Sequence, residues 1–387
     1  MPMQNFDFII PTRIYFGRKI LKDSLRKERT LLSGNLLIVT TGRSLIKIGY
    51  IRELMECLSE VIPNSTFTLF DEVDANPKVW QVEKAVRLGI EKHVRVIIGF
   101  GGGSAIDAAK AVAVGIGGGK PIDSFLFDGA IPPDTTLPVI AIPTTAGTGT
   151  ELSKGAILTS TERTIKTGLR GENLCPKIAI VDSYFTEKIP ERITIDTGFD
   201  VFAHALESFV SKKANPFSEM LSLEAIRIVI KNLPSLKKNL ANTEARNRMS
   251  YASMIMGMNL ASVGTALPHR LQYPIGARTD TSHGQGLMAL YPSWLKYEYK
   301  YSKEKLDEVA KIIINDNEVN NKKLDSIKVI CCFIKNLGFQ QNLKELGLMA
   351  DEVSVLEKDI TGNVLNDPVF QEQDIIQKIY KESYLGE

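Results

Sequence analysis

Short apolar runs alternate with amphipathic segments over the first half of the chain. The runs at 35–41 and 95–100 are mostly apolar, and each leads through a turn into a segment whose apolar residues recur every three or four positions. Such runs are typical of strands buried in a parallel sheet, and the segments after them are typical of helices. The alternation predicts an open, mainly parallel α/β sheet.

The pattern changes near residue 185, where the strand signals stop. Beyond this point nearly every segment has the helical spacing of apolar residues. This spacing predicts helices over residues 217–233, 243–261, 286–296 and 303–314. The shift marks a domain boundary, so we predict an α/β domain over residues 1–185 and an all-α domain over residues 186–387.

The sequence also predicts the local structure of two shorter segments. Residues 6–17 contain two apolar stretches separated by Pro11, which predicts a strand, a turn and a second strand closed by Gly17. The glycine cluster at 115–119 is followed by Lys120 and Pro121 without a helix signal, so we interpret it as a loop.

Composition and charge narrow the functional class. With 44% apolar and 24% charged residues and a net charge of +2, the chain has no electrostatic case for nucleic acid or an anionic membrane as partner. No uncharged apolar run is long enough to span a bilayer, and no signal-peptide pattern opens the chain. The four cysteines have no metal-type or disulfide-framework spacing, which suits a reducing compartment. We therefore expect a cytoplasmic protein.

The segment Thr197–Ser208 carries the first candidate chemistry. It has the apolar spacing of a buried helix, yet it contains Asp200 and His204, four residues apart. Residues at this spacing point the same way from a helix and can bind one object between them. Taken alone, the pair is more often an ordinary ion pair or a capping Asp beside a core His.

The distribution of histidines favours a metal ion over that simpler interpretation. The chain has four histidines, and His269 and His283 stand close together in a second segment. One Asp and three His suit divalent Fe, Zn, Ni or Co and leave room for a substrate oxygen. We predict Asp200, His204, His269 and His283 as the ligands. His93 lies just before a predicted strand and is interpreted as a solvated surface residue.

Two further loops have the composition of a nucleotide site. Gly101, Gly102, Gly103 and Ser104 lie between a predicted strand and a predicted helix, where backbone N–H groups can approach a pyrophosphate closely. The hydroxyl-rich loop at 144–150 follows another apolar strand and could bind a ribose or a nicotinamide amide. A flexible turn and a polar turn are the simpler alternatives for the two loops.

Assembled in order, these segments resemble the iron-containing (group III) alcohol dehydrogenase family over nearly the whole chain. The matching motifs are GGGSAIDAAK ending at Lys110, PTTAGTGTE ending at Glu151, TGFDVFAHALE over 197–207, and the segment with His269 and His283. The family pattern has Ser where this chain has Thr150. The resemblance implies a Rossmann-like sheet in the first domain, all-α architecture in the second, and the overall organisation of dehydroquinate synthase. Cofactor and metal are then expected to meet between the two domains.

The resemblance also implies roles for individual residues. The four predicted ligands match the family's metal ligands, with Fe²⁺ expected and Zn²⁺ possible. The positions that match cofactor contacts are Gly101, Gly102, Gly103, Ser104, Asp107, Thr144, Thr145, Thr148 and Lys166. Many members have a second His four residues after the third ligand, beside the substrate. This chain has Tyr273 there, so Tyr273 joins the catalytic candidates and the proton-handling role of that His is in doubt.

The cofactor preference follows from a second departure from the family pattern. Members that use NAD often place an Asp after the second strand to bind the adenosine ribose. This position is Thr41 here, followed by Gly42, Arg43 and Ser44. Loss of a carboxylate and gain of an Arg suit a 2′-phosphate, so NADP(H) is favoured over NAD(H).

The predicted reaction is reversible hydride transfer between a primary alcohol or aldehyde and NAD(P)(H), with aldehyde reduction favoured. Arg270 and Arg278 could bind an anionic group of the substrate, although structural ion pairs for both are the favoured interpretation. The alternatives are a metal-dependent lyase of the dehydroquinate-synthase type, a zinc polyol dehydrogenase, and a nucleotide-binding protein without catalysis. An exposed edge strand near the N-terminus would suit a homodimer or larger homo-oligomer.

Overall fold

The computed structural model describes residues 5–314, 324–339 and 341–386. Contacts within the chain divide it into two compact units. One unit is Ile9–Ile189, and the other is Pro190–Glu387 together with the N-terminal segment that ends at Phe8.

The first unit is built on a six-stranded sheet in which all neighbouring strands are parallel. The strands lie in the order β1-β8-β5-β4-β2-β3. Their bounds are β1 Arg13–Gly17, β2 Asn35–Thr41, β3 Thr66–Val73, β4 Val96–Gly101, β5 Val139–Pro143 and β8 Ile178–Asp182. This confirms the predicted parallel α/β domain.

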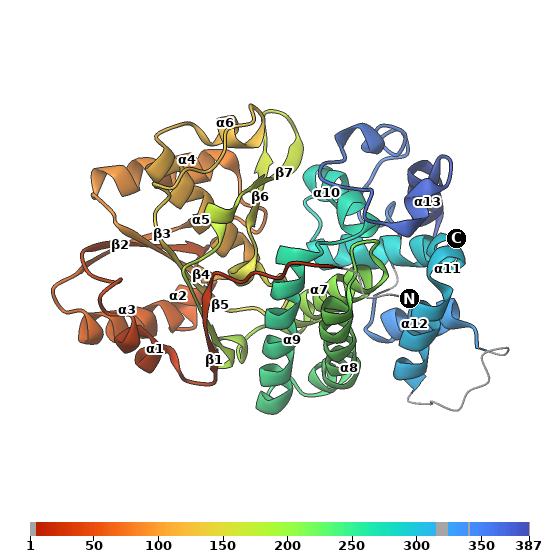
Figure 1. The fold of residues 1–387 in the computed structure, drawn as a ribbon, viewed down its shortest axis with the longest axis horizontal. Helices are drawn as coiled ribbons and strands as arrows, with labels where there is room; N and C mark the ends of the chain where they lie inside the picture. The colour runs from red at the N-terminus through yellow and green to blue at the C-terminus, as the bar shows by residue number, and fades with distance from the viewer. Residues whose placement is uncertain (1–4, 315–323, 340, 387) are drawn as a thin grey trace. The chain divides into compact units, whose positions relative to one another are not determined.

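Helices cover both faces of this sheet (Figure 1). Successive side chains of a strand point to opposite faces, so Leu37 and Val39 enter one core while Leu36 and Ile38 enter the other. Strands buried on both faces need apolar residues at every position, which explains the continuous apolar runs. The helices of this unit are α1 Leu21–Lys27, α2 Ser44–Lys47, α3 Tyr50–Val61, α4 Val79–Glu91, α5 Gly103–Gly118 and α6 Ile122–Leu126.

A separate antiparallel hairpin, β6 Gly155–Ser160 and β7 Ile165–Arg170, joins the part of the chain between β5 and β8. Three short 3₁₀ turns complete the unit, namely η1 Thr150–Leu152, η2 Glu172–Leu174 and η3 Ser183–Thr186.

Two local predictions in this region are wrong. Residues 6–10 form no strand, and Phe8 instead packs its ring edge-on against Phe217 of the helical unit, with the ring centroids 4.6 Å apart. The glycine cluster is no loop either, because α5 continues through Gly118 and ends at Gly119, whose φ of 60° is left-handed. A Cβ at Gly117 would lie 2.1 Å from the Thr135 carbonyl oxygen, so close packing explains a glycine inside this helix.

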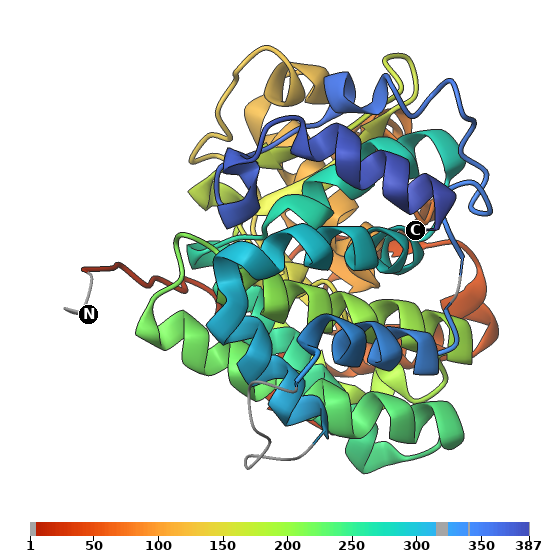
Figure 2. The same cartoon turned by 90° about the vertical axis from the view of Figure 1, so that its right-hand side faces the viewer.

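The second unit is helical throughout its described part, which confirms the predicted all-α character. Its helices are α7 Glu191–Val210, α8 Pro216–Lys238, α9 Thr243–Ser262, α10 Leu267–Thr279, α11 His283–Ile314, α12 Ser326–Asn336 and α13 Ile375–Leu385, with 3₁₀ turns η4 Leu356–Asp359 and η5 Pro368–Gln371. Figure 2 shows α13 beside α11, and the Tyr380 hydroxyl of α13 donates to the Leu271 carbonyl of α10 at 2.8 Å.

Helix α7 lies at the centre of this unit and contacts α8, α9 and α11. Nearly all of its residues from Thr194 onward are buried, including the polar ones. Among the residues that the structure describes, no helix is both long and apolar enough to cross a membrane.

Candidate functional site

Helix α7 presents three polar side chains on one buried face. Asp200, His204 and Glu207 stand at intervals of four and three residues, so a helix places them in one row. Asp200 and His204 are at most 5% exposed, and Glu207 is fully buried. A row of ionisable groups inside a core is costly unless each finds a partner of opposite charge or a metal.

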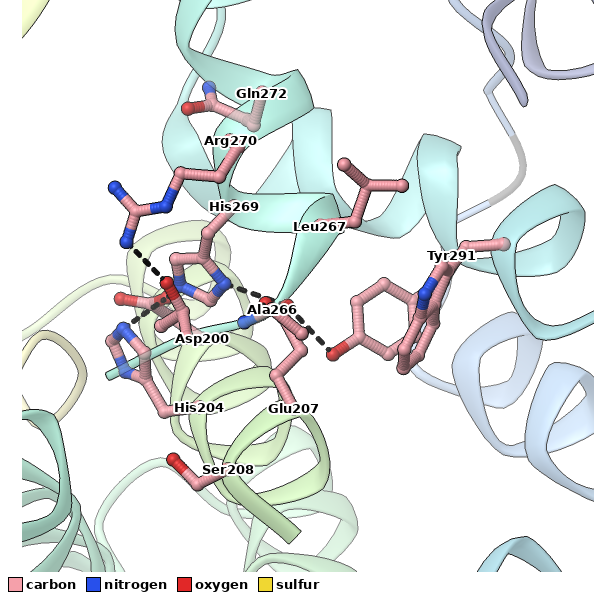
Figure 3. Close-up of polar contacts among 12 residues, drawn as sticks. Asp200, His204, Glu207, Ser208, Ala266, Leu267, His269, Arg270, Gln272 and Tyr291 are labelled. Atoms are coloured by element: carbon pink, nitrogen blue, oxygen red, sulfur yellow. Dashed lines mark hydrogen bonds and ion pairs between the residues drawn. The ribbon is translucent and has the colours of Figure 1, made fainter. Parts of the chain in front are cut away.

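Helices α10 and α11 bring two more imidazoles to this row. Figure 3 shows the first of them, His269 of α10, beside Asp200 and His204. His269 lies in the first turn of α10 and His283 is the first residue of α11. The Nε2 atoms of His204, His269 and His283 lie 3.7, 3.4 and 3.6 Å from Oδ1 of Asp200. Three imidazole nitrogens from three helices thus converge on one carboxylate oxygen.

These separations fit the coordination shell of a divalent transition metal. Tetrahedral ligands held at about 2.0–2.1 Å from zinc lie about 3.4 Å from one another. The candidate ligand atoms of Asp200, His269 and His283 all lie within 4.8 Å of each other. Within the described residues, Asp200 Oδ1 and His269 Nε2 are buried atoms without a hydrogen-bond partner. The donor set therefore fits Fe²⁺ or Zn²⁺, and the four ligands remain our prediction.

The outer nitrogens of two imidazoles are held by polar side chains. His269 Nδ1 lies 2.7 Å from Oε1 of Glu207, and His283 Nδ1 lies 2.5 Å from Oε1 of Gln272. Because both oxygens accept, each Nδ1 carries the proton and each Nε2 directs its lone pair toward Asp200. Lone pairs and a carboxylate oxygen that converge on one point need a cation there.

Sequence reasoning missed the roles of Glu207 and Gln272. Both were inside segments that we singled out, and both stand three residues after a predicted ligand. That helical spacing was the available signal. The backbone N–H of Ala266 and the Tyr291 hydroxyl donate to Glu207 as well, at 2.9 and 3.2 Å.

The charges within the cluster shift two pKa values in opposite directions. Burial alone would raise the pKa of Asp200, but His204, His283 and His269 together lower it well below its usual range. Burial alone would lower the pKa of His269, but the carboxylates of Glu207 and Asp200 raise it to about 9. The two carboxylates therefore favour positive charge between the imidazoles, whether a proton or a metal ion supplies it.

The glycine loop of the α/β unit lies where β4 passes into α5. From β2 the chain adds β3 on one side and β4 on the other, so the carboxyl ends of β2 and β4 form a topological switch point. Dinucleotides bind at such points in parallel sheets. Gly101 ends β4 with a φ of 155°, and a Cβ there would lie 2.7 Å from Cβ of Ala105 and 3.7 Å from Oγ1 of Thr41.

The hydroxyl-rich loop packs directly on this turn. A Cβ at Gly102 would lie 3.3 Å from Oγ1 of Thr145, and a Cβ at Gly103 would lie 2.6 Å from Cγ2 of Thr148. The backbone N–H of Thr144 donates to the Gly101 carbonyl at 2.9 Å. The structure thus brings the two predicted cofactor loops together at the carboxyl ends of β4 and β5.

Three other cofactor candidates hold parts of this unit together. Asp107 is buried and accepts hydrogen bonds from the Thr150 hydroxyl and, at 2.9 Å, from the Ile157 N–H. The Ser104 hydroxyl donates to the Ala75 carbonyl, and Lys166 donates to Asn76 Oδ1 at 3.0 Å. Their contacts to a cofactor remain predictions.

The other residues singled out in the sequence lie partly at the surface and partly in the interior. His93 is exposed at a turn with a φ of 50°, and it belongs to the α/β unit and not to the helical unit that contains Asp200. Tyr273 is buried one turn after His269, and its ring centroid lies 6.4 Å from that of His283. Arg278 forms the predicted ion pairs, with Glu352 and Asp359. The same prediction is wrong for Arg270, which has no carboxylate partner among the described residues.

Comparison with known families matches both halves of the chain. A sequence model described as iron-containing alcohol dehydrogenase matches residues 11–183. A second, described as Fe-containing alcohol dehydrogenase family, C-terminal, matches residues 194–384.

Individual relatives extend over most of the chain. A long-chain primary alcohol dehydrogenase of Thermoanaerobacter ethanolicus is 28% identical, over 99% of this chain and 98% of its own length. A sulfoacetaldehyde reductase of Bilophila wadsworthia is 31% identical over 79% of this chain and 78% of its own length. The crystal structure of an iron-containing alcohol dehydrogenase from Thermotoga maritima superposes with a TM-score of 0.85 at 30% identity, and covers 98% of this chain and 99% of that one.

Proposed function

The chain belongs to the iron-containing alcohol dehydrogenase family, and from this premise we propose that it reduces an aldehyde with NADPH at a ferrous centre. The reversible interconversion of alcohols and aldehydes is the activity of this family, and the relatives do not favour the lyase alternative. The observation that carries the metal assignment is the convergence of three imidazole nitrogens on Asp200 Oδ1 at 3.4–3.7 Å.

When bound, a divalent metal would act as a Lewis acid on the substrate oxygen, and a nicotinamide would carry the hydride. The protein contributes a charged and rigid cage. Asp200 provides one negative charge in a buried environment, where electrostatic interactions are strong. Glu207 and Gln272 fix the orientation of His269 and His283. The side chain of His283 is 27% exposed, so the cage is open on that side.

Tyr273 is our candidate for a residue beside the substrate. It stands one helical turn after His269, and its ring lies near that of His283. Its hydroxyl lies 3.3 Å from Nη1 of Arg270. A phenol held in this way can donate a hydrogen bond to a substrate oxygen.

The preference for NADP(H) rests on the turn after β2. Thr41 ends this strand beside Gly101, and Arg43 and Ser44 follow it on the surface. The turn offers a guanidinium and a hydroxyl to a 2′-phosphate. The Arg43→Ala variant should raise KM for NADPH more than KM for NADH. The Arg52→Ala control, at an exposed position of α3, should change neither.

We also propose a homo-oligomer in the cytoplasm. β1 lies at one edge of the sheet, and its outer backbone groups have no neighbouring strand in the described part of the chain. An open edge of this kind is suited to pairing with a second copy.

The deciding experiment combines metal analysis with turnover. After anaerobic reconstitution with Fe²⁺ or Zn²⁺, metal content is measured, and NADPH and NADH oxidation are followed with a panel of short aldehydes. The Asp200→Asn variant should lose both metal and turnover. The His93→Asn control removes an exposed imidazole at a left-handed turn that Asn tolerates, and should keep both. Full metal content and turnover in Asp200→Asn would contradict the proposal.

A further inference from the structure

Arg270 is a buried cation whose hydrogen-bond partners among the described residues are all neutral. The residue is 8% exposed and follows the predicted ligand His269 directly in helix α10. Its Nη2 donates to the Thr265 hydroxyl at 2.6 Å, and its Nη1 donates to the Tyr273 hydroxyl at 3.3 Å. Its Nε is buried without a hydrogen-bond partner in the described part of the chain.

In this arrangement most N–H donors of the guanidinium have no acceptor among the described residues. An arginine side chain has five N–H groups, and the structure uses two of them, so three have no acceptor among the described residues. The guanidinium lies 5.2 Å from the centroid of the Tyr273 ring, but a cation–π contact does not neutralise a buried charge. Burial of an unpaired charge is among the costliest arrangements in a protein.

Arg278, two turns further along the same helix, is an arginine with a structural role. It is paired with the carboxylates of both Asp359 and Glu352. The described chain therefore supplies counter-ions to one arginine of α10 and none to the other.

The position of Arg270 connects it to the metal cluster. It is the neighbour of His269, and Figure 3 shows its side chain leaving α10 toward the side where His269, Asp200 and His204 lie. Tyr273 bridges it to the other side of the cluster, because its hydroxyl contacts Arg270 and its ring lies 6.4 Å from that of His283.

Gly362 makes room for this guanidinium. A Cβ at this position would lie 2.8 Å from Nη1 of Arg270, so any other residue would crowd it. The backbone of Gly362 has a φ of 89°, which also favours glycine. The described part of the chain thus accommodates the cation at this place without placing a carboxylate against it.

We propose that Arg270 is the counter-ion for an anionic group of the substrate, and that the enzyme acts on short aldehydes that carry a sulfonate, phosphonate or carboxylate close to the carbonyl. This inference rests on the proposed aldehyde reduction. A planar guanidinium with unused donors binds such oxyanions through paired hydrogen bonds. The metal cluster would then bind the carbonyl end while Arg270 and Tyr273 hold the charged end.

The test compares selectivity between charged and neutral substrates of similar size. The kcat/KM of the metal-loaded enzyme is measured for sulfoacetaldehyde, phosphonoacetaldehyde, succinic semialdehyde and neutral butanal. At least one anionic aldehyde should be preferred over butanal by about 100-fold, because a site built around a charge rejects analogues that lack it. The anion with the highest ratio identifies the group. A wild-type enzyme that prefers butanal to all three would overturn the proposal.

The variants separate substrate binding from structure. Arg270→Gln should lower the ratio of anionic to neutral kcat/KM by about 100-fold, mainly through KM, and Arg270→Lys should restore part of it. The matched control Arg278→Gln removes an ion-paired arginine from the same helix and should keep the ratio. An unchanged ratio in Arg270→Gln, or weakened NADPH binding in its place, would show that Arg270 does not recognise the substrate.

Equilibrium binding distinguishes this inference from the proposed function. Ethanesulfonate, ethylphosphonate and butyrate cannot react as aldehydes. At least one of these three anions should bind the metal-loaded enzyme in calorimetry, and Arg270→Gln should abolish this binding. If aldehydes turn over but binding of all three anions is independent of Arg270, the inference fails and the function stands. If no aldehyde turns over while binding of one of these anions depends on Arg270, the proposed reaction fails and the anion site stands.

Discussion

At the scale of single residues, the carboxylates of α7 have different tasks. Asp200 faces the three Nε2 atoms, whereas Glu207, two turns later, accepts from the outer nitrogen of His269. An ionised carboxylate in this outer position orients the imidazole and makes it a stronger electron donor. In the proposed metal site, Glu207 would therefore act on the metal through His269 and not by direct contact.

Replacement of Glu207 by Gln should weaken metal binding by about 10- to 100-fold, because an amide keeps the hydrogen-bond geometry without the charge. Competition with a chelator of known affinity measures the effect. The control Glu191→Gln removes an exposed carboxylate from the first turn of the same helix and should leave the affinity unchanged. If Glu207→Gln binds the metal with wild-type affinity, the charge of Glu207 does not contribute to metal binding.

At the scale of elements, the start of α5 depends on close contact between two loops. Gly103 is the first residue of this helix, and the hydroxyl-rich loop lies against it. Close packing of this kind lets the free backbone N–H groups of the helix start face a phosphate. It also makes the loop sensitive to a single added methyl group.

The Gly103→Ala variant places a Cβ 2.6 Å from Cγ2 of Thr148 and should displace the loop. Overpacking typically costs about 1–3 kcal/mol, so the dissociation constant of NADPH should rise about tenfold or more. A fluorescence titration with NADPH measures it. Gly155→Ala is the matched control, since the nearest heavy atom there is 3.6 Å away. Equal NADPH affinities in the two variants would show that this loop does not contribute to cofactor binding.

The same region contains a buried ionic cluster beneath the loops. Lys110 is fully buried and donates to the Thr150 hydroxyl at 2.9 Å and to the carbonyls of Ser153 and Gly155 at 2.9 Å each. Burial lowers the pKa of Lys110 to about 8 and raises the pKa of the neighbouring Glu151 to about 7. The stability of this part of the protein should therefore depend on pH.

Glu151 allows the sign of that dependence to be worked out. Its pKa rises from an ordinary 4.5 to about 7, so between these values the folded protein holds a proton that the unfolded chain has released. The contribution of Glu151 to the unfolding free energy is thus present below pH 4.5 and is lost as pH rises to 7.

Glu151→Gln cannot ionise, so its stability relative to wild type should increase from pH 4.5 to 8 by on the order of 3 kcal/mol. Urea unfolding at several pH values in this range measures the difference. In Glu162→Gln, at an exposed turn, the unfolding free energy should have the same pH dependence as in the wild type. A constant difference between Glu151→Gln and wild type would show that Glu151 is ionised throughout.

For the molecule as a whole, the proposed chemistry is divided between the two units. The parallel sheet supplies backbone N–H groups and hydroxyls at its carboxyl edge, and the helical unit supplies imidazoles and carboxylates from α7, α10 and α11. A metal that joins three helices stabilises the folded state by binding it in preference to the unfolded chain.

Fe²⁺ or Zn²⁺ at about 100 times its dissociation constant should stabilise the folded state by about 2.7 kcal/mol, which corresponds to roughly 5–10 °C in Tm for a unit of this size. Calorimetry of the metal-free and metal-loaded protein measures the shift. Mg²⁺, which prefers oxygen ligands, and the Asp200→Asn variant with Zn²⁺ should give none. An equal shift with Mg²⁺ would place the stabilising site elsewhere.

Features that depend on neighbours along the chain could be predicted from the sequence. Apolar runs predicted the strands, because a strand buried on both faces has no polar position, and the spacing of Asp200 and His204 predicted their common face, because helix geometry is local. The packing of the helices brings His269 and His283 together on Asp200 and places Glu207 and Gln272 against them. It also pairs Arg278 with Asp359, whereas Arg270 has no carboxylate partner among the described residues. Apart from Gln272 and its neighbour His283, these partners lie more than 60 residues apart in the chain, so no local pattern specifies them and only the packing of the helices brings them together.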